Sequence, residues 1–363
     1  MINNFIYEQP VKIYFGKGFL SKLDEVLDEI GSETCVLVTS KFFAPKADEI
    51  LKKSKKLKAV FSGVVPNPLL SGAEEVVKLI KENSADTVIA LGGGSSIDTA
   101  KFAAACAYSE KTPHELYLKQ DFPKKVAKIV AIPTTSGTGS EVTKVSVISH
   151  GNEKKSIHNP AFMPTAAIVD PLLTMSVPAR TTMITGIDAF THAIEAYWSV
   201  NHQPITDGFA IQSIRLIIEN LEKAYSEPDE ESKTNMAYAS LLAGLAFALP
   251  KTAACHACSF PLSANYHLPH GEACALTLDS LMLLNNSQRL EELSKQVGAE
   301  STEKLAEYIR HLKEISGLCT KLSELGEVDI DMLSRESAKH PLMANNPVKL
   351  TEDDLRKMFE KLR

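Results

Sequence analysis

Apolar and polar residues follow two different patterns along the chain, and the change falls near residue 178. Before that point, short apolar runs such as TVIAL (87–91) and KIVAI (128–132) alternate with amphipathic segments of helical period. Uninterrupted apolar runs of this length are typical of strands buried on both faces of a parallel sheet. Strands that alternate with helices indicate βαβ units, so we expect an α/β domain with a mainly parallel sheet.

From about residue 178 onward, the apolar positions follow a helical period only. Such patterns cover 181–199, 204–226, 229–249, 272–286, 288–298, 301–315 and 351–362, and no convincing strand interrupts them. We therefore expect an α/β domain over 1–180 and an all-helical domain over 181–363, with the boundary near 178–185. A chain of 363 residues is long enough to form two such cores.

Composition and charge exclude several classes of protein. The hydrophobic fraction of 44% and the charged fraction of 23% are those of an ordinary globular protein. A net charge of −6 argues against nucleic acid or an anionic membrane as the main partner. The N-terminus lacks the basic and apolar regions of a signal peptide, and the apolar, uncharged stretch from Thr234 to Pro250 is too short to span a bilayer. Six scattered cysteines suit free thiols in a reducing compartment, so we expect a cytoplasmic protein.

A glycine-rich turn, LGGGSSID (91–98), follows one of the buried strands and opens a helix. Gly93 and Gly94 allow the backbone to approach a ligand closely, and the free amides at the start of a helix bind anions such as a pyrophosphate. We expect Ser95 to cap this helix, with Asp98 three residues later as its capping partner. The alternative is a tight strand-to-helix turn that needs glycine for its geometry alone.

A second loop, PTTSGTGSEVT (133–143), follows the next buried strand. Its hydroxyls, among them Thr134, Thr135 and Thr138, suit hydrogen bonds to a phosphate, a ribose or a carboxamide. The alternative is a loop rich in turns and helix caps. Two such loops after successive parallel strands favour a dinucleotide site, although neither has the GxGxxG pattern of an ordinary Rossmann dehydrogenase.

The choice between NAD(H) and NADP(H) depends on the end of the second strand. A carboxylate there would hydrogen-bond the ribose 2′-hydroxyl and repel a 2′-phosphate. The segment VLVTSKFF (36–43) offers Ser40 and Lys41 instead and has no carboxylate. This favours NADP(H) over NAD(H), unless Lys41 is only an ordinary surface lysine.

An acid–imidazole–acid stripe lies on the apolar helix predicted for GIDAFTHAIEAYWS (186–199). Asp188, His192 and Glu195 fall at i, i+4 and i+7, so the three project from one helix face. The first interpretation is structural, with Asp188 and His192 forming a buried hydrogen-bonded pair. The second is that both residues bind a metal ion whose remaining ligands come from elsewhere in the chain.

The stretch ACHACSFPLSANYHLPHGEA (254–273) offers the further imidazoles of His256, His267 and His270. Its two prolines distribute these residues over a helix, a loop and the start of another helix. Two of the three histidines, with Asp188 and His192, would complete a His/Asp set that suits Fe(II), Zn(II) or Mn(II). A structural zinc site at the CxxC pair around His256 would need a second such pair, and only Cys274 is nearby, so we expect these cysteines to be small buried thiols.

Together these stretches resemble the iron-containing (group III) alcohol dehydrogenase family, within the superfamily that includes dehydroquinate synthase and glycerol dehydrogenase. The resemblance covers essentially the whole chain. The matching stretches are VKIYFGKGFLSKL (11–23), PNP (66–68), GGGSSIDTAK (92–101), PTTSGTGSEVT, IVDPLLTMSVP (168–178), GIDAFTHAIEAYWS, the H-x13-H-G run ending at His270-Gly271, and ANNPVKLTEDDL (344–355).

The resemblance implies a role for each matching position. The four metal ligands of the family match Asp188, His192, His256 and His270, which leaves Glu195 as a helix neighbour. The cofactor-contacting positions match Asn67, Gly93, Gly94, Ser95, Asp98, Thr134, Thr135, Thr138 and Lys155. The first domain would then bind the dinucleotide, and the second would bind the metal and the substrate.

The activity that the resemblance implies is a metal-dependent, NAD(P)-linked alcohol dehydrogenase working as an aldehyde reductase. Hydride would pass between the nicotinamide and an alcohol or aldehyde held at Fe(II), with Zn(II) as the other metal that fits. Members of the family often form homodimers or larger homo-oligomers. The competing interpretations are a dehydroquinate synthase-like lyase with no net redox change, and a nucleotide-binding sensor that has lost catalysis.

Two positions depart from the family pattern or add to it. Many members have a proton-transferring histidine four residues after the third ligand, where this chain has Phe260. His267 is a candidate substitute, and the alternative is a loop histidine bonded to backbone. Lys251, five residues before His256, is a candidate partner for a carboxylate or phosphonate on the substrate, and the alternative is a lysine reaching to solvent.

Overall fold

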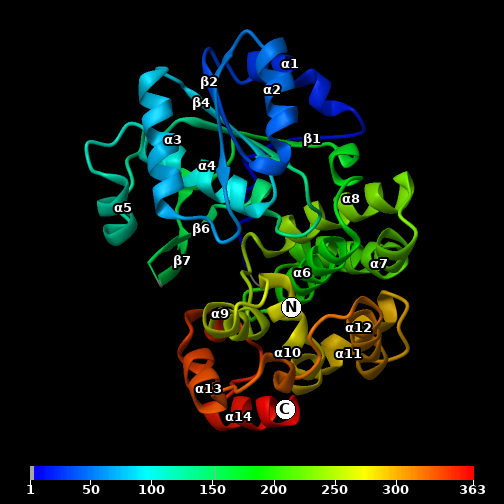
Figure 1. The fold of residues 1–363 in the computed structure, drawn as a ribbon. Coiled ribbons are helices and arrows are strands. Elements are labelled where there is room, and N and C mark those ends of the chain that lie inside the picture. The colour runs from blue at the N-terminus through cyan, green and yellow to red at the C-terminus, as the bar shows by residue number, and fades with distance from the viewer. Residues whose placement is uncertain (1–3, 152) are drawn as a thin grey trace. The chain divides into compact units, whose positions relative to one another are not determined.

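The computed structural model describes residues 4–151 and 153–363 and divides into two compact units (Figure 1). The α/β unit comprises Glu8–Thr135 and Gly139–Ser176. The helical unit comprises Val177–Arg363, the short segment 136–138 and the described residues before Glu8. The expected fold class, an α/β region with a mainly parallel sheet followed by a helical region, is confirmed.

The α/β unit is built on a sheet whose described strands lie in the order β1-β8-β5-β4-β2-β3. These strands are β1 Lys12–Phe15, β2 Cys35–Ser40, β3 Leu57–Val64, β4 Thr87–Gly92, β5 Lys128–Pro133 and β8 Ala166–Val169. All of their pairings are parallel. The two uninterrupted apolar runs are β4 and β5, which pair side by side within the sheet, as expected for strands buried on both faces.

Helices cover both faces of this sheet (Figure 1). They are α1 Leu23–Glu29, α2 Ala44–Lys53, α3 Leu70–Glu82, α4 Gly94–Cys106 and α5 Pro113–Lys119. Successive strand residues point to opposite faces, so Leu37 and Ile89 enter a core with α1 and α2. Their neighbours Val36 and Val88 enter a separate core with α3, α4 and α5.

An antiparallel pair, β6 Val145–His150 and β7 Glu153–His158, follows β5 and was not expected from the sequence. β7 is largely polar, and apolar residues of β6 are interrupted by serines, with only alternate residues buried, so neither strand has the long apolar run of β4 or β5. Short 3-10 turns complete the unit: η1 Phe19–Lys22, η2 Lys41–Phe43, η3 Ser140–Val142, η4 Pro160–Phe162 and η5 Pro171–Thr174.

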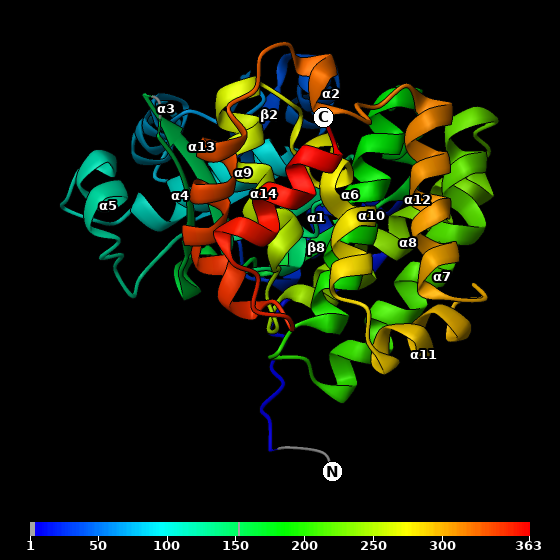
Figure 2. The same cartoon turned by 90° about the horizontal axis from the view of Figure 1, so that it is seen from below.

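The helical unit is organised around α6. Its helices are α6 Ala179–Trp198, α7 Pro204–Ser226, α8 Glu230–Phe247, α9 Ala254–Tyr266, α10 His270–Leu284, α11 Gln288–Gln296, α12 Thr302–Ser316, α13 Ile330–Lys339 and α14 Glu352–Lys361, with 3-10 turns η6 Leu322–Leu325 and η7 Pro341–Asn345. Every residue from Gly186 to Trp198 is buried, because α7, α8, α9, α10 and α12 all pack against α6. The last helices, α13 and α14, lie together beside α9 (Figure 2).

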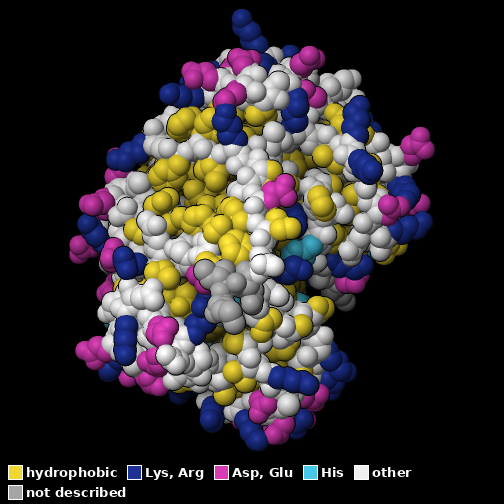
Figure 3. Space-filling view, turned by 180° about the vertical axis from the view of Figure 1, so that it is seen from behind, with side chains coloured by type: hydrophobic (Ala, Val, Ile, Leu, Met, Phe, Trp, Pro, Cys, Tyr) yellow, Lys and Arg dark blue, Asp and Glu magenta, His cyan; other side chains and the backbone are white. Residues whose placement is uncertain are grey.

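The surface carries charges of both signs. On the face drawn in Figure 3, lysine and arginine side chains are interspersed with aspartate and glutamate. Among the described residues, no helix combines the length and the apolar character needed to cross a membrane.

Gly271, the second residue of α10, sets the distance between α10 and α6. A Cβ atom at this position would lie 2.4 Å from the carbonyl oxygen of Ile184 and 3.0 Å from the Cβ atom of Asp188. The first of these neighbours is backbone and cannot rotate away. Only glycine therefore lets the start of α10 lie directly against the turn of α6 that carries Asp188.

Gly271→Ala is expected to lower the free energy of unfolding by ~1–3 kcal/mol, because the backbone of α6 or α10 must shift to accept the methyl group. The matched control is Gly208→Ala in α7, where an added Cβ meets nothing within 4 Å, and this change should be neutral or stabilising by up to ~1 kcal/mol. Urea unfolding followed by circular dichroism compares the two. Equal stability of both variants would contradict the close packing of α10 on α6.

Candidate active site

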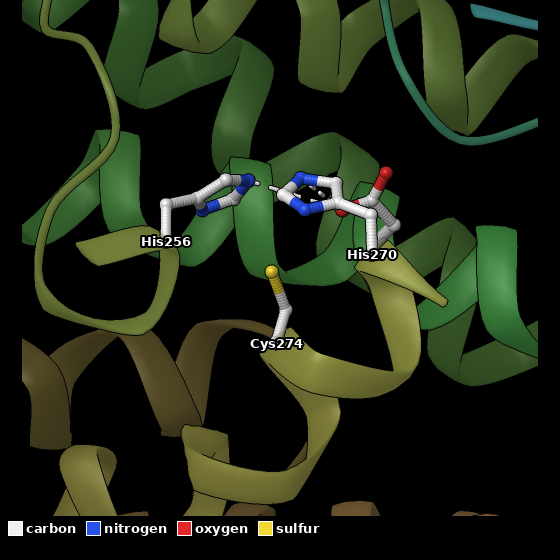
Figure 4. A group of neighbouring side chains, drawn as sticks. His256, His270 and Cys274 are labelled. Atoms are coloured by element: carbon white, nitrogen blue, oxygen red, sulfur yellow. Dashed lines mark ion pairs between the residues drawn. The ribbon is translucent and has the colours of Figure 1, made fainter. Parts of the chain in front are cut away.

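Side chains from three helices converge on one point inside the helical unit (Figure 4). The ligand atoms of Asp188 on α6, His256 on α9, and His270 and Cys274 on α10 all lie within 4.8 Å of one another. Figure 4 shows the rings of His256 and His270 turned toward each other and the thiol of Cys274 pointing between them. The side chains of Asp188 and His256 are each 5% exposed and that of His270 is 35% exposed, so the group is open to solvent at His270.

The carboxylate of Asp188 lies near three imidazole rings at once. Its Oδ1 atom is 3.9 Å from His192 Nδ1, 3.8 Å from His256 Nε2 and 3.9 Å from His270 Nε2. These separations are too long for hydrogen bonds. The two distances to Nε2 atoms, those of His256 and His270, are near the spacing of donors around one ion, since two ligand atoms about 2.1 Å from a tetrahedral metal lie ~3.4 Å apart.

His192 reaches the same group from α6. Its Nε2 atom lies 3.0 Å from Nε2 of His256, and its ring stacks on Phe247 with ring centroids 4.2 Å apart. Its Nδ1 atom donates to the carbonyl oxygen of Gly137 at 3.2 Å. A Cβ on Gly137 would lie 2.7 Å from the Cβ of Thr185, so the segment 136–138 packs directly on α6.

Glu195, expected to be only a helix neighbour, holds His256 in place. Its carboxylate is fully buried and accepts hydrogen bonds from Nδ1 of His256 at 2.6 Å, the backbone N–H of Ala253 at 2.9 Å and the backbone N–H of Cys255 at 2.6 Å. One acid on α6 therefore fixes both the start of α9 and the orientation of the His256 ring. A metal-binding histidine commonly has this type of carboxylate partner on its other nitrogen.

The two facing Nε2 atoms provide a test of whether a metal fits the residues. Each ring uses its Nδ1–H as a donor, His192 to a carbonyl and His256 to a carboxylate, so in the neutral rings both Nε2 atoms carry lone pairs. Two lone pairs 3.0 Å apart repel each other unless a cation, either a proton or a metal ion, lies between them. Burial lowers the pKa of His192 well below its ordinary value, which keeps its Nε2 available as a ligand.

The pKa of His256 is shifted in the opposite direction from that of His192. Burial alone lowers the pKa of His256, but Cys274 and the Glu195 carboxylate outweigh it and raise this pKa well above its ordinary value. The raised pKa favours a proton on Nε2, on the side that faces His192 and Asp188, and a metal ion bound there would displace that proton. The residues present thus fit a divalent metal ion, with an aspartate and three imidazoles as its donors.

The structure brings three of the expected ligands, Asp188, His256 and His270, together with Cys274, which was not among them. His192 lies outside that group and borders it through its Nε2 atom, 3.0 Å from Nε2 of His256. Cys274 follows His270 by one helical turn, so the two side chains share a face of α10. That spacing, i and i+4 from a candidate histidine, was present in the sequence and could have identified it. The pKa of the Cys274 thiol is raised overall, because the effect of burial exceeds the opposing effect of the His256 ring.

His267 and Lys251, the two residues expected to act on the substrate, both lie at helix ends. His267 is exposed, with a left-handed backbone (φ 59°) at the end of α9. Lys251 is exposed with φ 65°, and its N–H donates to the carbonyl of Phe247. Among the described hydrogen bonds and ion pairs, neither side chain is joined to the four histidine and aspartate ligands.

A histidine that the sequence did not single out lies against Phe260. The ring of His340, at the start of η7, stacks on Phe260 with centroids 4.4 Å apart, and Phe260 also meets His270 edge-on at 6.4 Å. Nδ1 of His340 accepts the N–H of Leu342, so the neutral ring carries its proton on Nε2. Burial, and then the nearby His256, lower the pKa of His340. No sequence pattern links residues 260 and 340.

In the α/β unit, α4 begins at Gly94 with Gly93 as its N-cap, so the expectation that Ser95 caps this helix is wrong. No side chain caps the helix, and its first amides are left for an anion. Gly92 has φ 156°, and a Cβ there would lie 2.4 Å from the hydroxyl oxygen of Ser96. Glycine is thus required where β4 turns into α4.

Asp98, expected to contact the cofactor, has both carboxylate oxygens engaged within the protein. Oδ1 accepts from the Ser140 hydroxyl at 2.7 Å and Oδ2 from the Val147 N–H at 3.0 Å. The buried Nζ of Lys101 donates to Ser140 Oγ and to the carbonyl of Thr143, each at 2.8 Å. Burial lowers the pKa of Lys101 and the Asp98 carboxylate raises it in part, so that the pKa is lowered overall to about 8. These residues tie the glycine turn to the hydroxyl-rich loop.

The hydroxyl-rich loop is divided between the two units. The N–H of Thr134 donates to the carbonyl of Gly92, and the Thr134 hydroxyl is buried without a hydrogen-bond partner among the described residues. A Cβ on Gly93 would lie 3.2 Å from the Thr135 hydroxyl, which brings the two loops into contact. Thr138 belongs to the segment 136–138 of the helical unit.

Asn67 is brought to Lys154, whereas the sequence had singled out Lys155. Nζ of Lys154 donates to Oδ1 of Asn67 at 2.9 Å, and Asn67 has a left-handed backbone with φ 54°. Lys155 lies 4.5 Å over the ring of Tyr117 and pairs with Glu153. The two lysines are neighbours on β7, so they point to opposite faces and cannot serve the same contact.

Ser40 ends β2 and Lys41 begins η2, in line with the predicted position at the end of the second strand. Ser40 is half-buried and Lys41 is exposed. No carboxylate occurs from Val36 to Phe43.

Known proteins match the chain along nearly its whole length. The model for "Iron-containing alcohol dehydrogenase" matches residues 10–171, and the model for "Fe-containing alcohol dehydrogenase family, C-terminal" matches residues 182–363. A long-chain-alcohol dehydrogenase of Geobacillus thermodenitrificans is 35% identical over 97% of this chain and 95% of its own. An NADPH-dependent butanol dehydrogenase of Clostridium saccharobutylicum is 33% identical over 97% of this chain and 96% of its own.

Among solved structures, a sulfoacetaldehyde reductase from Bifidobacterium kashiwanohense in complex with NAD+ is similar to this chain. Its TM-score is 0.95 and its sequence identity is 39%, over 99% of each chain.

Glu195→Gln is expected to weaken metal binding by about 10- to 100-fold, because the amide cannot accept all three hydrogen bonds and leaves the His256 ring loosely held. Dialysis of the metal-loaded protein against a chelator, followed by elemental analysis, measures the metal retained. Glu219→Gln, an exposed glutamate on α7, is the matched control and should retain metal as the parent does. Full retention by the Glu195 variant would show that the carboxylate does not support the metal site.

Proposed function

The chain belongs to the iron-containing alcohol dehydrogenase family and is an oxidoreductase, and from this premise we propose that it reduces a small aldehyde bearing an acidic group at the expense of a nicotinamide cofactor. The observation that carries the proposal is the convergence of Asp188, His256 and His270, with Nε2 of His192 3.0 Å from Nε2 of His256. The matches to dehydrogenases favour this activity over the lyase and sensor alternatives.

We assign the metal to these four side chains, with Fe(II) as the expected ion and Zn(II) accommodated by the same donors. A divalent cation bound there would polarise the aldehyde carbonyl, or in the reverse direction lower the pKa of the alcohol, so that hydride can be transferred. The residues of the chain orient that cation: Glu195 and the Gly137 carbonyl hold the two rings, and Phe247 stacks on one of them.

Support for an acidic substrate comes from Lys251 and from the similarity to a sulfoacetaldehyde reductase. Lys251 adopts a left-handed backbone, which costs a non-glycine residue about 1–2 kcal/mol and is common at functional sites. It lies two residues before Ala253, whose N–H is fixed on Glu195, so its position relative to His256 is constrained. Its ammonium group is exposed and suits a sulfonate, carboxylate or phosphonate.

For the cofactor, we propose that NADP(H) is favoured over NAD(H). Ser40 and Lys41 place a hydroxyl and a cation where a carboxylate would repel a 2′-phosphate. The uncapped start of α4 suits the pyrophosphate, and Thr134, Thr135 and Thr138 supply hydroxyls nearby in the sequence. Lys101 and Asp98 act as positioning residues that hold the two loops together.

We also propose a cytoplasmic location, which the six free, buried cysteines support. A homodimer or larger homo-oligomer stays a prediction.

The substrate class is tested by anaerobic NADPH oxidation with the iron-reconstituted protein, comparing sulfoacetaldehyde, succinic semialdehyde and butanal, with NADH run alongside. We expect a higher kcat/KM for the acidic aldehydes. Lys251→Ala should lower that value by about 10-fold while butanal is unaffected, because a charge-assisted hydrogen bond is worth ~1.5–3 kcal/mol. Lys361→Ala, an exposed lysine on α14, is the control. A preference for butanal would remove the acidic-substrate proposal and keep the enzyme class.

For proton exchange with the substrate oxygen, we propose Nε2 of His340 as the donor in place of the histidine that Phe260 replaces. His340→Gln should lower kcat by about 100-fold with little change in KM, and should remove the basic limb of the pH profile, since a general acid contributes 10²–10⁴-fold. His267→Gln is the comparison and should change kcat by less than about twofold, because His267 is exposed at the end of α9. The reverse result would assign the proton donor to His267.

A further inference from the structure

Cys274 is the one cysteine whose sulfur lies in the group of metal-binding atoms found among the described residues. Its side chain is fully buried, and it lies one turn deeper along α10 than the partly exposed His270. The thiol points between the rings of His256 and His270 (Figure 4). Its sulfur therefore approaches the site from the interior of the unit, and His270 borders the side open to solvent.

The size of the group suits one ion with a sulfur donor. The oxygen, nitrogen and sulfur atoms of Asp188, His256, His270 and Cys274 are no more than 4.8 Å apart. Opposite donors on one zinc-sized ion lie ~4.4 Å apart, from bonds of about 2.1 Å to nitrogen and about 2.3 Å to sulfur. An ion that reaches the carboxylate and the imidazoles is thus within bonding distance of the thiol after small side-chain adjustments.

The packing of α10 makes the position of this thiol a fixed property of the fold. Gly271 lies between His270 and Cys274, and its missing side chain lets α10 contact the backbone of α6 at Ile184. The start of α10, which carries His270 and Cys274, therefore lies close to Asp188. Cys258, a second buried thiol on α9, lies outside the group.

We propose that Cys274 is a fifth protein ligand of the metal site, on its buried side, in addition to the aspartate and the three histidines. The inference rests on the proposed function, since it concerns the same ion. The bond formed is between the metal and the sulfur, and the thiol proton is released to solvent as the metal binds. The group is most open at His270, which is 35% exposed, so a substrate oxygen would reach an ion held by these residues from that side.

A sulfur ligand changes which metals the site retains. Thiolates are soft donors that favour Zn(II) and Co(II) relative to Fe(II) more strongly than carboxylates or imidazoles do. The chain should therefore hold zinc and cobalt more tightly than an otherwise identical site without the cysteine.

The test uses the full-length protein loaded with Co(II). Visible d–d bands report that cobalt is bound, and a near-ultraviolet thiolate-to-cobalt charge-transfer band reports a sulfur ligand. We expect both in the parent protein, loss of the charge-transfer band alone in Cys274→Ser, and both in the control Cys258→Ser. Zinc retention against a chelator should fall by about 10-fold or more in Cys274→Ser and stay within twofold in the control.

Other spectra would contradict either the ligand role of Cys274 alone or the proposed function as well. A charge-transfer band that persists in Cys274→Ser, or that is missing from a parent protein with visible d–d bands, shows that Cys274 is not a ligand and leaves the proposed function intact. A parent protein with no d–d bands binds no metal, and the proposed function fails together with this inference. Cys274→Ala, checked for folding by circular dichroism, distinguishes loss of the ligand from misfolding of the serine variant.

Discussion

The hydrogen bonds accepted by the buried carboxylate of Glu195 position the candidate site of the helical unit. Glu195 lies on a helix whose final turns are buried all round, where an unpaired charge would be very costly. It accepts three hydrogen bonds, two from the start of α9 and one from His256. The same interactions that make this acid tolerable in the core also fix the start of α9 and the tautomer of His256, a candidate metal ligand. The contacts that stabilise this region therefore also orient a side chain of the candidate site.

A buried charge also positions the backbone in the α/β unit, but here the charge is a cation. Lys101 is a buried cation whose donors are taken up by a hydroxyl and backbone carbonyls of the loop after β5. Asp98, on the same helix, accepts from that loop and from β6. The N-cap of α4 is Gly93, and no side chain caps the first amides of the helix. In both units, buried charges position the backbone that surrounds a binding site.

The sequence predicted much of this architecture, and the reasons differ by element. The strands β4 and β5 were recognisable because a strand buried on both faces is apolar throughout, whereas β6 is buried only at alternate residues and β7 is largely polar. Asp188 and His192 were recognisable because i, i+4 spacing on a helix is local geometry. His256 and His270 followed from a family resemblance.

Other features depended on contacts between distant parts of the chain. The stack of His340 on Phe260 joins residues eighty positions apart, and the pairing of Asn67 with Lys154 rather than Lys155 depends on which face of β7 meets the turn at Asn67. Cys274 had a readable spacing from His270, but nothing local indicated that α10 would lie against α6 closely enough to use it. The role of Glu195 was hidden for a similar reason, because its partners are backbone amides that no side-chain pattern reveals.

The uneven exposure of the ligands has a kinetic consequence. Asp188, His192 and His256 are 5–7% exposed, while His270 is 35% exposed. An ion held by these residues would be shielded from solvent on the side of Asp188, His192 and His256, so we expect it to exchange from the side of His270. Because three of the ligands are almost completely buried, we expect this exchange to be slow. The metal found in a purified sample would then record which ion arrived first, during or soon after folding, more than which ion binds most tightly at equilibrium.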